Sequence, residues 1–173
     1  MAQARPDLEI EALAAHHHRD GFSCGVDSLD RYLRTQASQD VRRKANGVFV
    51  LVEPDRPDVV LGYYTLCATG VAQGDVPPAA RKHIPRYPLV SATLVGRLAV
   101  SQARQGERLG AMLLADAVRR THASAATIGS SMLVVDAINE RAAAFYEGNG
   151  FVRLPDSLRL VLPMRTIQRL LEP

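Results

Sequence analysis

Gly106 and Gly110 stand where a short loop runs into an amphipathic stretch, in the sequence ARQGERLGAMLLADAVRR at residues 103–120. A helix N-terminus offers unpaired N–H groups and a partial positive charge, so such a loop is a candidate phosphate site. Ala111 and Met112 follow where a P-loop needs Lys and Ser/Thr, and a dinucleotide fingerprint needs a third glycine. What remains is a pyrophosphate held by backbone amides without a metal. The alternative is that Gly106 only turns the chain and Gly110 packs against a strand.

A mixed set of strands and helices must position this loop. The expected elements are a strand at 6–13, one broken or two short helices at 26–46, a hairpin of strands at 47–53 and 59–71, a short helix at 76–88, a strand at 91–100, a helix at 108–124, a strand at 130–137, a helix at 139–150 and a last strand at 158–164. Asp27 and Asn139 are the expected N-caps, with Asp30 completing a box-like start and Gly148 or Gly150 ending the helix at 139–150. The pattern predicts one α+β (mixed α/β) domain over residues 1–173, a central mixed sheet flanked by helices.

Composition limits the function classes. Hydrophobic residues make up 47% of the chain and charged residues 23%, which is ordinary for a globular protein. The longest apolar runs are too short to span a membrane and the N-terminus carries acids where a signal peptide is apolar, so we expect a cytosolic protein. The net charge of +3 is compatible with an anionic partner without requiring one. Cys24 and Cys67 lie in unrelated segments and are expected to be free thiols.

Two segments together resemble the GCN5-related N-acetyltransferase (GNAT) family, whose members use acetyl-coenzyme A. LVGRLAVSQARQGERLGAMLLADAV is followed about twenty residues later by LVVDAINERAAAFYEGNGFVRL. Gln105 and Gly110 match the family's Q/R-x-x-G-x-G/A loop, with Arg108 in place of its first glycine. The second motif is matched by Asn139, Ala142, Phe145, Tyr146, Gly150 and Phe151. The resemblance implies the GNAT fold, with acetyl-CoA as the cofactor and no metal.

The same resemblance assigns roles to residues. It implies that the backbone N–H and C=O groups of Leu98, Ala99 and Val100 form hydrogen bonds with the pantetheine arm. It implies that the loop binds the diphosphate through Gln105, Gly106, Glu107, Arg108, Leu109, Gly110 and Ala111. Asn139 has two open roles, capping its own helix or contacting the cofactor. Tyr146 stands where the family places the acid that protonates the departing thiolate; its alternative is packing of the helix on the sheet.

A narrower resemblance covers residues 21–165. FSCGVDSLDRYLRTQASQDVRRKANGVFVL, LGYYTL, IPRYPLVSATLVGRLAV and LRLVLPM are similar to bacterial GNAT toxins that acetylate aminoacyl-tRNA. That resemblance implies a toxin that blocks translation, a ribbon-helix-helix antitoxin, operator DNA bound only through the antitoxin complex, and a homodimer. The alternatives are a GNAT that acetylates a small-molecule amine or a protein N-terminus, and a non-catalytic CoA-binding module.

The acceptor chemistry agrees with this interpretation. An α-amine has a reference pKa of about 7.7–8.0 and is appreciably neutral at pH 7, whereas a lysine amine, at about 10.4, is almost wholly protonated. An α-amine substrate therefore needs no dedicated strong base. Asp136 and Glu140 are candidates for relaying a proton through water, but exposed carboxylates are more often simply solvated.

Basic residues supply candidate contacts to tRNA. They are Arg42, Arg43, Lys44, Arg81, Lys82, Arg86 and Arg97. Tyr63, Tyr64 and Tyr87 are candidates for stacking on a terminal base, the alternatives being hydrated helix faces and sheet packing. HHHRD at residues 16–20 suggests a metal site, but consecutive histidines cannot all point the same way and no other cluster completes one. We predict a solvated loop there.

Overall fold

The computed structural model describes residues 7–172 and divides the chain into two compact units. Among the described residues, the first unit comprises residues 7–66 and 97–116, and the second comprises residues 67–96 and 117–172. Two strands and the longest helix run from one unit into the other.

The described chain alternates strands and helices in a mixed order. The strands are β1 (Glu9–Ala12), β2 (Gly47–Val52), β3 (Gly62–Ala72), β4 (Leu89–Val100), β5 (Met132–Asp136), β6 (Val152–Arg153) and β7 (Arg159–Pro163). The α-helices are α1 (Asp27–Thr35), α2 (Ala37–Arg42), α3 (Pro78–Arg81), α4 (Leu109–Ile128), α5 (Glu140–Gly148) and α6 (Met164–Leu171), and two 3₁₀ turns, η1 (Gln73–Asp75) and η2 (Gln102–Arg104), join them. The strands form one seven-stranded sheet in the order β1-β2-β3-β4-β5-β7-β6, so the predicted mixed α/β architecture is confirmed.

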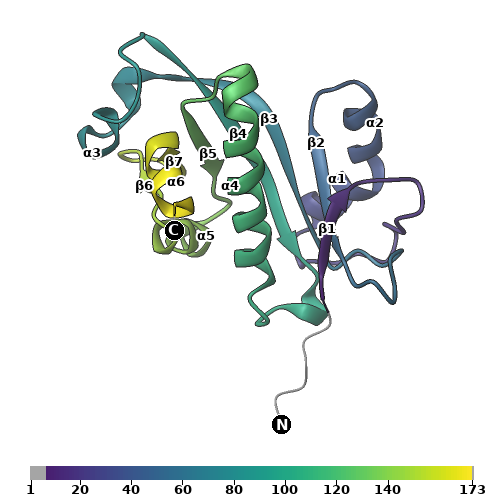
Figure 1. Ribbon diagram of the computed structural model, residues 1–173. Coiled ribbons are helices and arrows are strands. Elements are labelled where there is room, and N and C mark those ends of the chain that lie inside the picture. The colour runs from purple at the N-terminus through teal and green to yellow at the C-terminus, as the bar shows by residue number, and fades with distance from the viewer. Residues whose placement is uncertain (1–6, 173) are drawn as a thin grey trace. The chain divides into compact units, whose positions relative to one another are not determined.

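In the first unit, β1 pairs antiparallel with β2, and β2 pairs antiparallel with β3 (Figure 1). The run GVFVLV in β2 is rich in β-branched and aromatic residues, which suits a strand with a buried face. Leu29, Tyr32 and Leu33 of α1 turn inward, and they pack with Val48, Val50 and Tyr63 into a common core. This core supports the β4 end that leads into the glycine-bearing loop.

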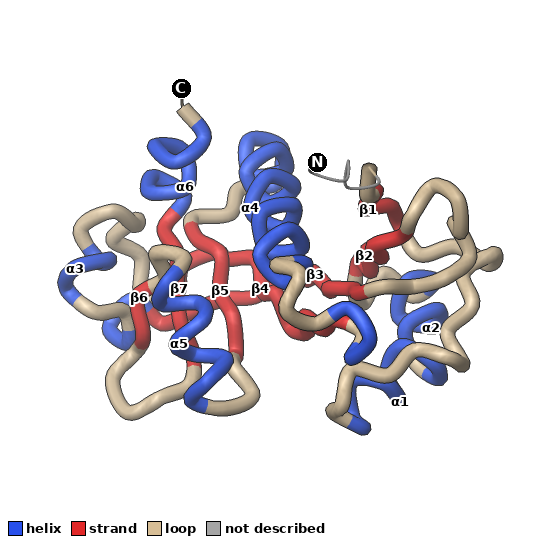
Figure 2. Tube along the Cα trace, turned by 90° about the horizontal axis from the view of Figure 1, so that it is seen from below, coloured by secondary structure: helices blue, strands red, loops and turns tan. Residues whose placement is uncertain are grey.

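In the second unit, β5 lies between β4 and β7. It runs parallel to β4 and antiparallel to β7, and β6 extends the sheet by pairing with β7. Every residue of β5 except Asp136 is buried, which explains why this strand is a continuous apolar run. Helix α5 runs beside β6 and β7, and α6 begins where β7 ends (Figure 2).

The main elements agree with the sequence predictions, and three details differ. The N-cap of α1 is Val26, without a side-chain cap, so the prediction for Asp27 was wrong. Asp30 instead accepts a hydrogen bond from the Cys24 amide. Strand β6 and helix α6 were missed, because β6 spans only two residues and α6 continues directly from the buried strand β7. No helix within residues 7–172 is long and apolar enough to span a lipid bilayer.

Candidate functional site

Strand β4 offers an open edge near its carboxyl end. Its parallel pairing with β5 ends at Val95, opposite Val135, while β4 itself continues to Val100. The backbone of Leu98, Ala99 and Val100 therefore runs beyond the last β5 partner. On the other edge of this stretch, β3 approaches β4 closely: a Cβ on Gly62 of β3 would lie 2.9 Å from the Ala99 carbonyl oxygen of β4. Gly62 is thus required for β3 to approach β4 at this point.

The loop after β4 presents the N-terminus of α4. The first helical hydrogen bond runs from the Met112 N–H to the Arg108 carbonyl, at 3.2 Å. The N–H groups of Leu109, Gly110 and Ala111 consequently have no acceptor inside the helix. They form the positive end of a twenty-residue helix dipole, which favours a bound anion.

Gln105 holds this loop in place. Its side-chain amide donates to the Val100 carbonyl at 3.1 Å and to the Cys24 carbonyl at 3.0 Å. Arg104 also stabilises the loop, because its guanidinium forms ion pairs with Glu53 and with Glu107. The Gln105 side chain is therefore used to shape the loop.

Arg108 explains the departure from the family motif. It has a φ of 62°, in the left-handed region that glycine adopts without cost. Arg108 therefore adopts the left-handed backbone conformation that the first glycine of the family motif would adopt without strain. Gly106, with a φ of 87°, also needs this conformation, and no atom of the described chain lies within 4 Å of where its Cβ would be.

Tyr146 lies on the inner face of α5. Its ring makes edge-on contacts with Phe145 and Phe151, with ring centroids 5.1 Å and 5.6 Å apart, and only 7% of the residue is exposed. Burial raises the pKa of the Tyr146 hydroxyl to about 12. The phenol therefore stays protonated through the physiological range, as a proton donor must.

Three polar residues near the start of α5 are already engaged. The Asn139 side chain accepts a hydrogen bond from the Ala142 N–H at 2.9 Å, so its capping role is confirmed. Asp136 receives two hydrogen bonds from Arg159, and Glu140 receives two from Arg153. The hydrogen bonds with Arg153 hold the pKa of Glu140 below its usual value. These ion pairs argue against both carboxylates as proton relays.

The predicted RNA contacts fall into different environments. Arg42, Arg43, Lys44, Lys82 and Arg86 are exposed. Their side chains are accessible to a large anionic partner.

Arg81 is less available, because its guanidinium donates to the carbonyls of Gly74 and Val76. Tyr63 and Tyr64 are fully buried, so they cannot stack on a base, whereas Tyr87 is 69% exposed.

Arg97 stacks on an aromatic ring. Its guanidinium carbon lies 3.5 Å from the ring centroid of Tyr32, in a cation–π arrangement. The Tyr32 hydroxyl donates to Asp40 at 2.8 Å and accepts from Asn46 at 3.2 Å. This network fixes a half-buried arginine on β4, in the stretch that runs beyond its last β5 partner. The sequence did not indicate the stack, because its partners are 65 residues apart.

The histidine segment differs from the solvated loop that we predicted. His16 and His18 are exposed, but His17 is buried. Its Nδ1 accepts a hydrogen bond from the Ala14 N–H, so its Nε2 carries the proton donated to Glu11 at 2.7 Å. Glu11, His16 and His17 have ligand atoms within 4.8 Å of one another. Both ring nitrogens of His17 are used in hydrogen bonds, so a metal could bind there only by displacing one of these bonds.

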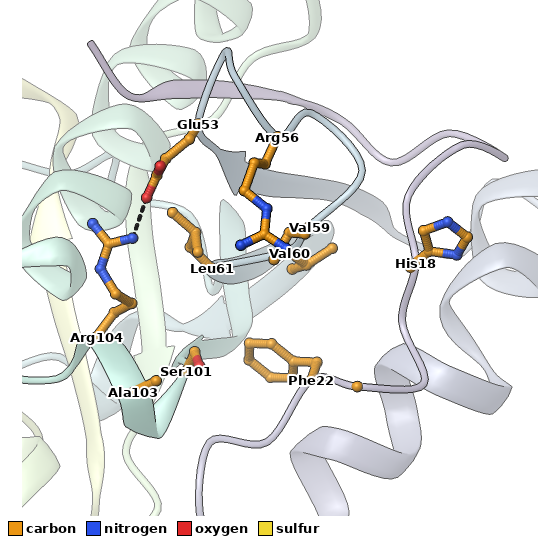
Figure 3. Close-up of a pocket in the computed structure, with 11 residues that line it drawn as sticks. His18, Phe22, Glu53, Arg56, Val59, Val60, Leu61, Ser101, Ala103 and Arg104 are labelled. Carbon is orange, nitrogen blue, oxygen red and sulfur yellow. Dashed lines mark hydrogen bonds and ion pairs between the residues drawn. The ribbon is translucent and has the colours of Figure 1, made fainter. Parts of the chain in front are cut away.

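A pocket of about 340 Å³ lies beside the loop in the first unit (Figure 3). Phe22, Val60 and Leu61 give it an apolar wall, and Ala103 and Arg104 form the side next to the loop. Arg56 and the Glu53–Arg104 ion pair provide its charged groups. Sequence reasoning missed this pocket, because its walls come from three separate segments and no motif marks them.

Comparisons with known proteins agree with this geometry. The GNAT acetyltransferase domain model matches residues 45–153. The tRNA-acetylating toxin of Mycobacterium tuberculosis is 36% identical over 87% of this chain and 88% of its own length. A probable TacT toxin of Sinorhizobium fredii is 27% identical over 94% of both chains. The toxin AtaT, solved with acetyl-methionyl-tRNA, superposes with a TM-score of 0.88 at 32% identity, covering 96% of this chain and all of AtaT. The chain therefore belongs to the GNAT acetyltransferase family, among its TacT-like toxins.

Proposed function

We propose that this protein is a toxin that transfers the acetyl group of acetyl-CoA to the α-amino group of aminoacyl-tRNA and thereby stops translation. The observation that carries the proposal is its 36% identity to a tRNA-acetylating toxin over 87% of the chain. The structure of AtaT with acetyl-methionyl-tRNA supports an acylated α-amine as the product.

Acetyl-CoA is the proposed acetyl donor, and it supplies a thioester that an amine can attack. AtaT has been solved with acetyl-CoA, which supports this assignment. The free N–H groups at the start of α4 and the open edge of β4 fit a diphosphate and an extended amide arm. The residues assigned to acetyl-CoA are Leu98, Ala99, Val100, Gln105, Gly106, Glu107, Arg108, Leu109, Gly110 and Ala111. Asn139 is left out, because its side chain caps α5.

The acceptor amine must be neutral to attack. With a reference pKa of about 7.7–8.0, an α-amine supplies its own neutral form near physiological pH. No carboxylate base is needed, which agrees with the engagement of Asp136 and Glu140 in ion pairs. During the transfer the nitrogen forms a bond to the acetyl carbon and loses one proton, while the carbon–sulfur bond breaks.

Tyr146 is the proposed general acid. A thiolate leaves with a pKa near 8.5, by analogy with cysteine, and the Tyr146 phenol can protonate it as the bond breaks. The raised pKa of Tyr146, about 12, makes its phenolate a strong base. The phenolate would then recover the proton lost by the amine, which restores the enzyme and balances the reaction.

Partners follow by analogy with the relatives. AtaT has been solved bound to the C-terminus of the antitoxin AtaR, and an AtaT–AtaR complex and a KacTA complex have been solved with DNA. We infer a ribbon-helix-helix antitoxin, operator DNA bound through the antitoxin complex, a homodimer, and action in the cytoplasm where charged tRNA is found.

The test is to incubate purified protein with labelled acetyl-CoA and charged tRNA. Label is expected in RNA, and mild base should release it together with the amino acid. Uncharged tRNA is the matched control and should stay unlabelled. Label that enters only polyamines or peptide N-termini, or tight CoA binding without turnover, would contradict the proposal.

A further inference from the structure

Helices α3 and α6 bring together cations that are far apart in the sequence. Both helices contact β7 in the second unit, and Figure 2 shows them beside the part of the sheet formed by β6 and β7. Lys82 directly follows α3. Arg165 and Arg169 lie one turn apart on α6, so their side chains share a face of that helix. Buried Ile167 fixes the helix and leaves both arginines exposed.

His83 follows Lys82 at the end of α3. Burial lowers its pKa, and the charges of Lys82, Arg165 and Arg169 lower it further. The contacts that α3 and α6 both make with β7 are the geometric basis for grouping these three cations with His83. All the charged groups acting on His83 are positive. We call Lys82, His83, Arg165 and Arg169 the α3–α6 cluster.

The three cations of the α3–α6 cluster have no ion-pair partner among the described residues. Within residues 7–172, Lys82, Arg165 and Arg169 form no ion pair. The neighbouring Arg81 differs, since its guanidinium is bonded to backbone carbonyls. The His83 Nδ1 atom is buried and has no hydrogen-bond partner in the part of the chain that the structure describes. Buried polar atoms are nearly always paired, so this atom marks an incomplete environment.

Like charges that gather without a counter-charge repel one another, and an anion placed among them is stabilised. We propose that the α3–α6 cluster binds the phosphate backbone of the tRNA substrate. This inference rests on the proposed function, because charged tRNA is the polyanion that the enzyme must hold. Arginine suits the role, since its planar fork matches phosphate oxygens. Such contacts give affinity without sequence readout.

The binding test uses the full chain and uncharged tRNA, with anisotropy measured over a range of salt concentrations. Lys82→Gln/Arg165→Gln/Arg169→Gln is expected to raise Kd about tenfold or more near 0.1 M salt. It should also flatten the slope of log K against log salt by about 2–3, since three phosphate contacts are lost. The matched control is Arg31→Gln/Arg34→Gln/Arg119→Gln, which removes the same charge from exposed positions on α1 and α4. Equal losses in both triple variants would overturn the proposal.

Kinetics separate this inference from the proposed function. The cluster variant should raise KM for charged tRNA and change KM for acetyl-CoA less than about twofold. If the parent enzyme acetylates charged tRNA and the cluster variant keeps the parent KM, only the α3–α6 inference fails. If the parent enzyme does not acetylate charged tRNA at all, the proposed function fails first.

A measurement on the unaltered protein avoids any folding defect of the variants. The His83 imidazole is titrated by NMR with and without tRNA at low salt. A bound phosphate favours the charged imidazolium, so the pKa of His83 should move upward when tRNA is added. An unchanged His83 titration, or a shift produced by duplex DNA or an acidic peptide but not by tRNA, would overturn the proposal.

Discussion

The loop at residues 105–111 and the helix α5 serve the same proposed reaction by different means. The loop offers backbone N–H groups at the start of α4, and its Gln105 side chain is hydrogen-bonded to the Val100 and Cys24 carbonyls. Helix α5 offers one side-chain hydroxyl, that of Tyr146, in an apolar setting. The loop should therefore tolerate changes of side chain and respond to changes of backbone. Helix α5 should respond to the loss of a single oxygen atom.

The largest effect is expected at Tyr146. Tyr146→Phe removes the proposed acid and keeps the ring contacts with Phe145 and Phe151. Turnover should fall about 10²-fold or more, while KM for acetyl-CoA stays within about twofold of the parent value. Steady-state kinetics with charged tRNA measures both constants. Equal turnover in mutant and parent would remove Tyr146 from the mechanism.

The pH dependence gives the next largest effect. The rate at subsaturating charged tRNA should rise about 50-fold from pH 6 to pH 8, as an α-amine of pKa about 8 loses its proton. The Tyr146 phenol, with a pKa of about 12, loses its proton only far above this range, so no descending limb should appear below pH 9. Initial rates at constant ionic strength test this profile. A fall in rate between pH 7 and pH 9 would contradict the assigned state of Tyr146.

A backbone change in the loop should weaken acetyl-CoA binding. Ala111→Pro removes one N–H in the first turn of α4, where proline is tolerated best. Loss of one charge-assisted hydrogen bond should raise the Kd for acetyl-CoA about tenfold. Ala111→Ser keeps the N–H and serves as the control in calorimetric titration. The same affinity in both variants would show that this N–H does not contact the cofactor.

The smallest effect concerns the side chain at Arg108. Its left-handed backbone costs an arginine or an alanine about 1 kcal/mol more than a glycine. Glycine also increases the conformational entropy of the unfolded chain, which offsets part of this stabilisation of the folded state. Arg108→Gly should therefore be more stable than Arg108→Ala by about 0.5 kcal/mol. Urea unfolding of the two variants measures the difference, and a more stable Arg108→Ala would show that the loop adopts another conformation in solution.

The order of elements could be predicted because each main strand or helix carries a local pattern. Strand β5 is a short apolar run, and Asn139 caps α5 as its sequence position suggests. The place of the loop before α4 and of Tyr146 on α5 could be predicted because their motifs are contiguous, whereas their roles stay predictions. Contacts between residues that only the folded chain brings together have no local sequence pattern and could not be predicted. The stack of Arg97 on Tyr32 joins residues that are distant in the sequence, and so do the contacts of α3 and α6 with β7.

Burial also overrode simple expectations. His17 lies in a run that reads as a solvated loop, yet it is buried because both of its ring nitrogens find partners. Tyr64 was a candidate for stacking on a base, but it is fully buried. Hydrophilic and aromatic residue types do not by themselves reveal which side chains the packed chain encloses.

A crystal structure of the full protein with acetyl-CoA tests the central claim most directly. We expect diphosphate oxygens about 3 Å from N–H nitrogens of Leu109, Gly110 or Ala111, and the sulfur within about 3.5 Å of the Tyr146 hydroxyl oxygen. A diphosphate bound away from the start of α4, or a Tyr146 hydroxyl directed away from the sulfur, would contradict the account.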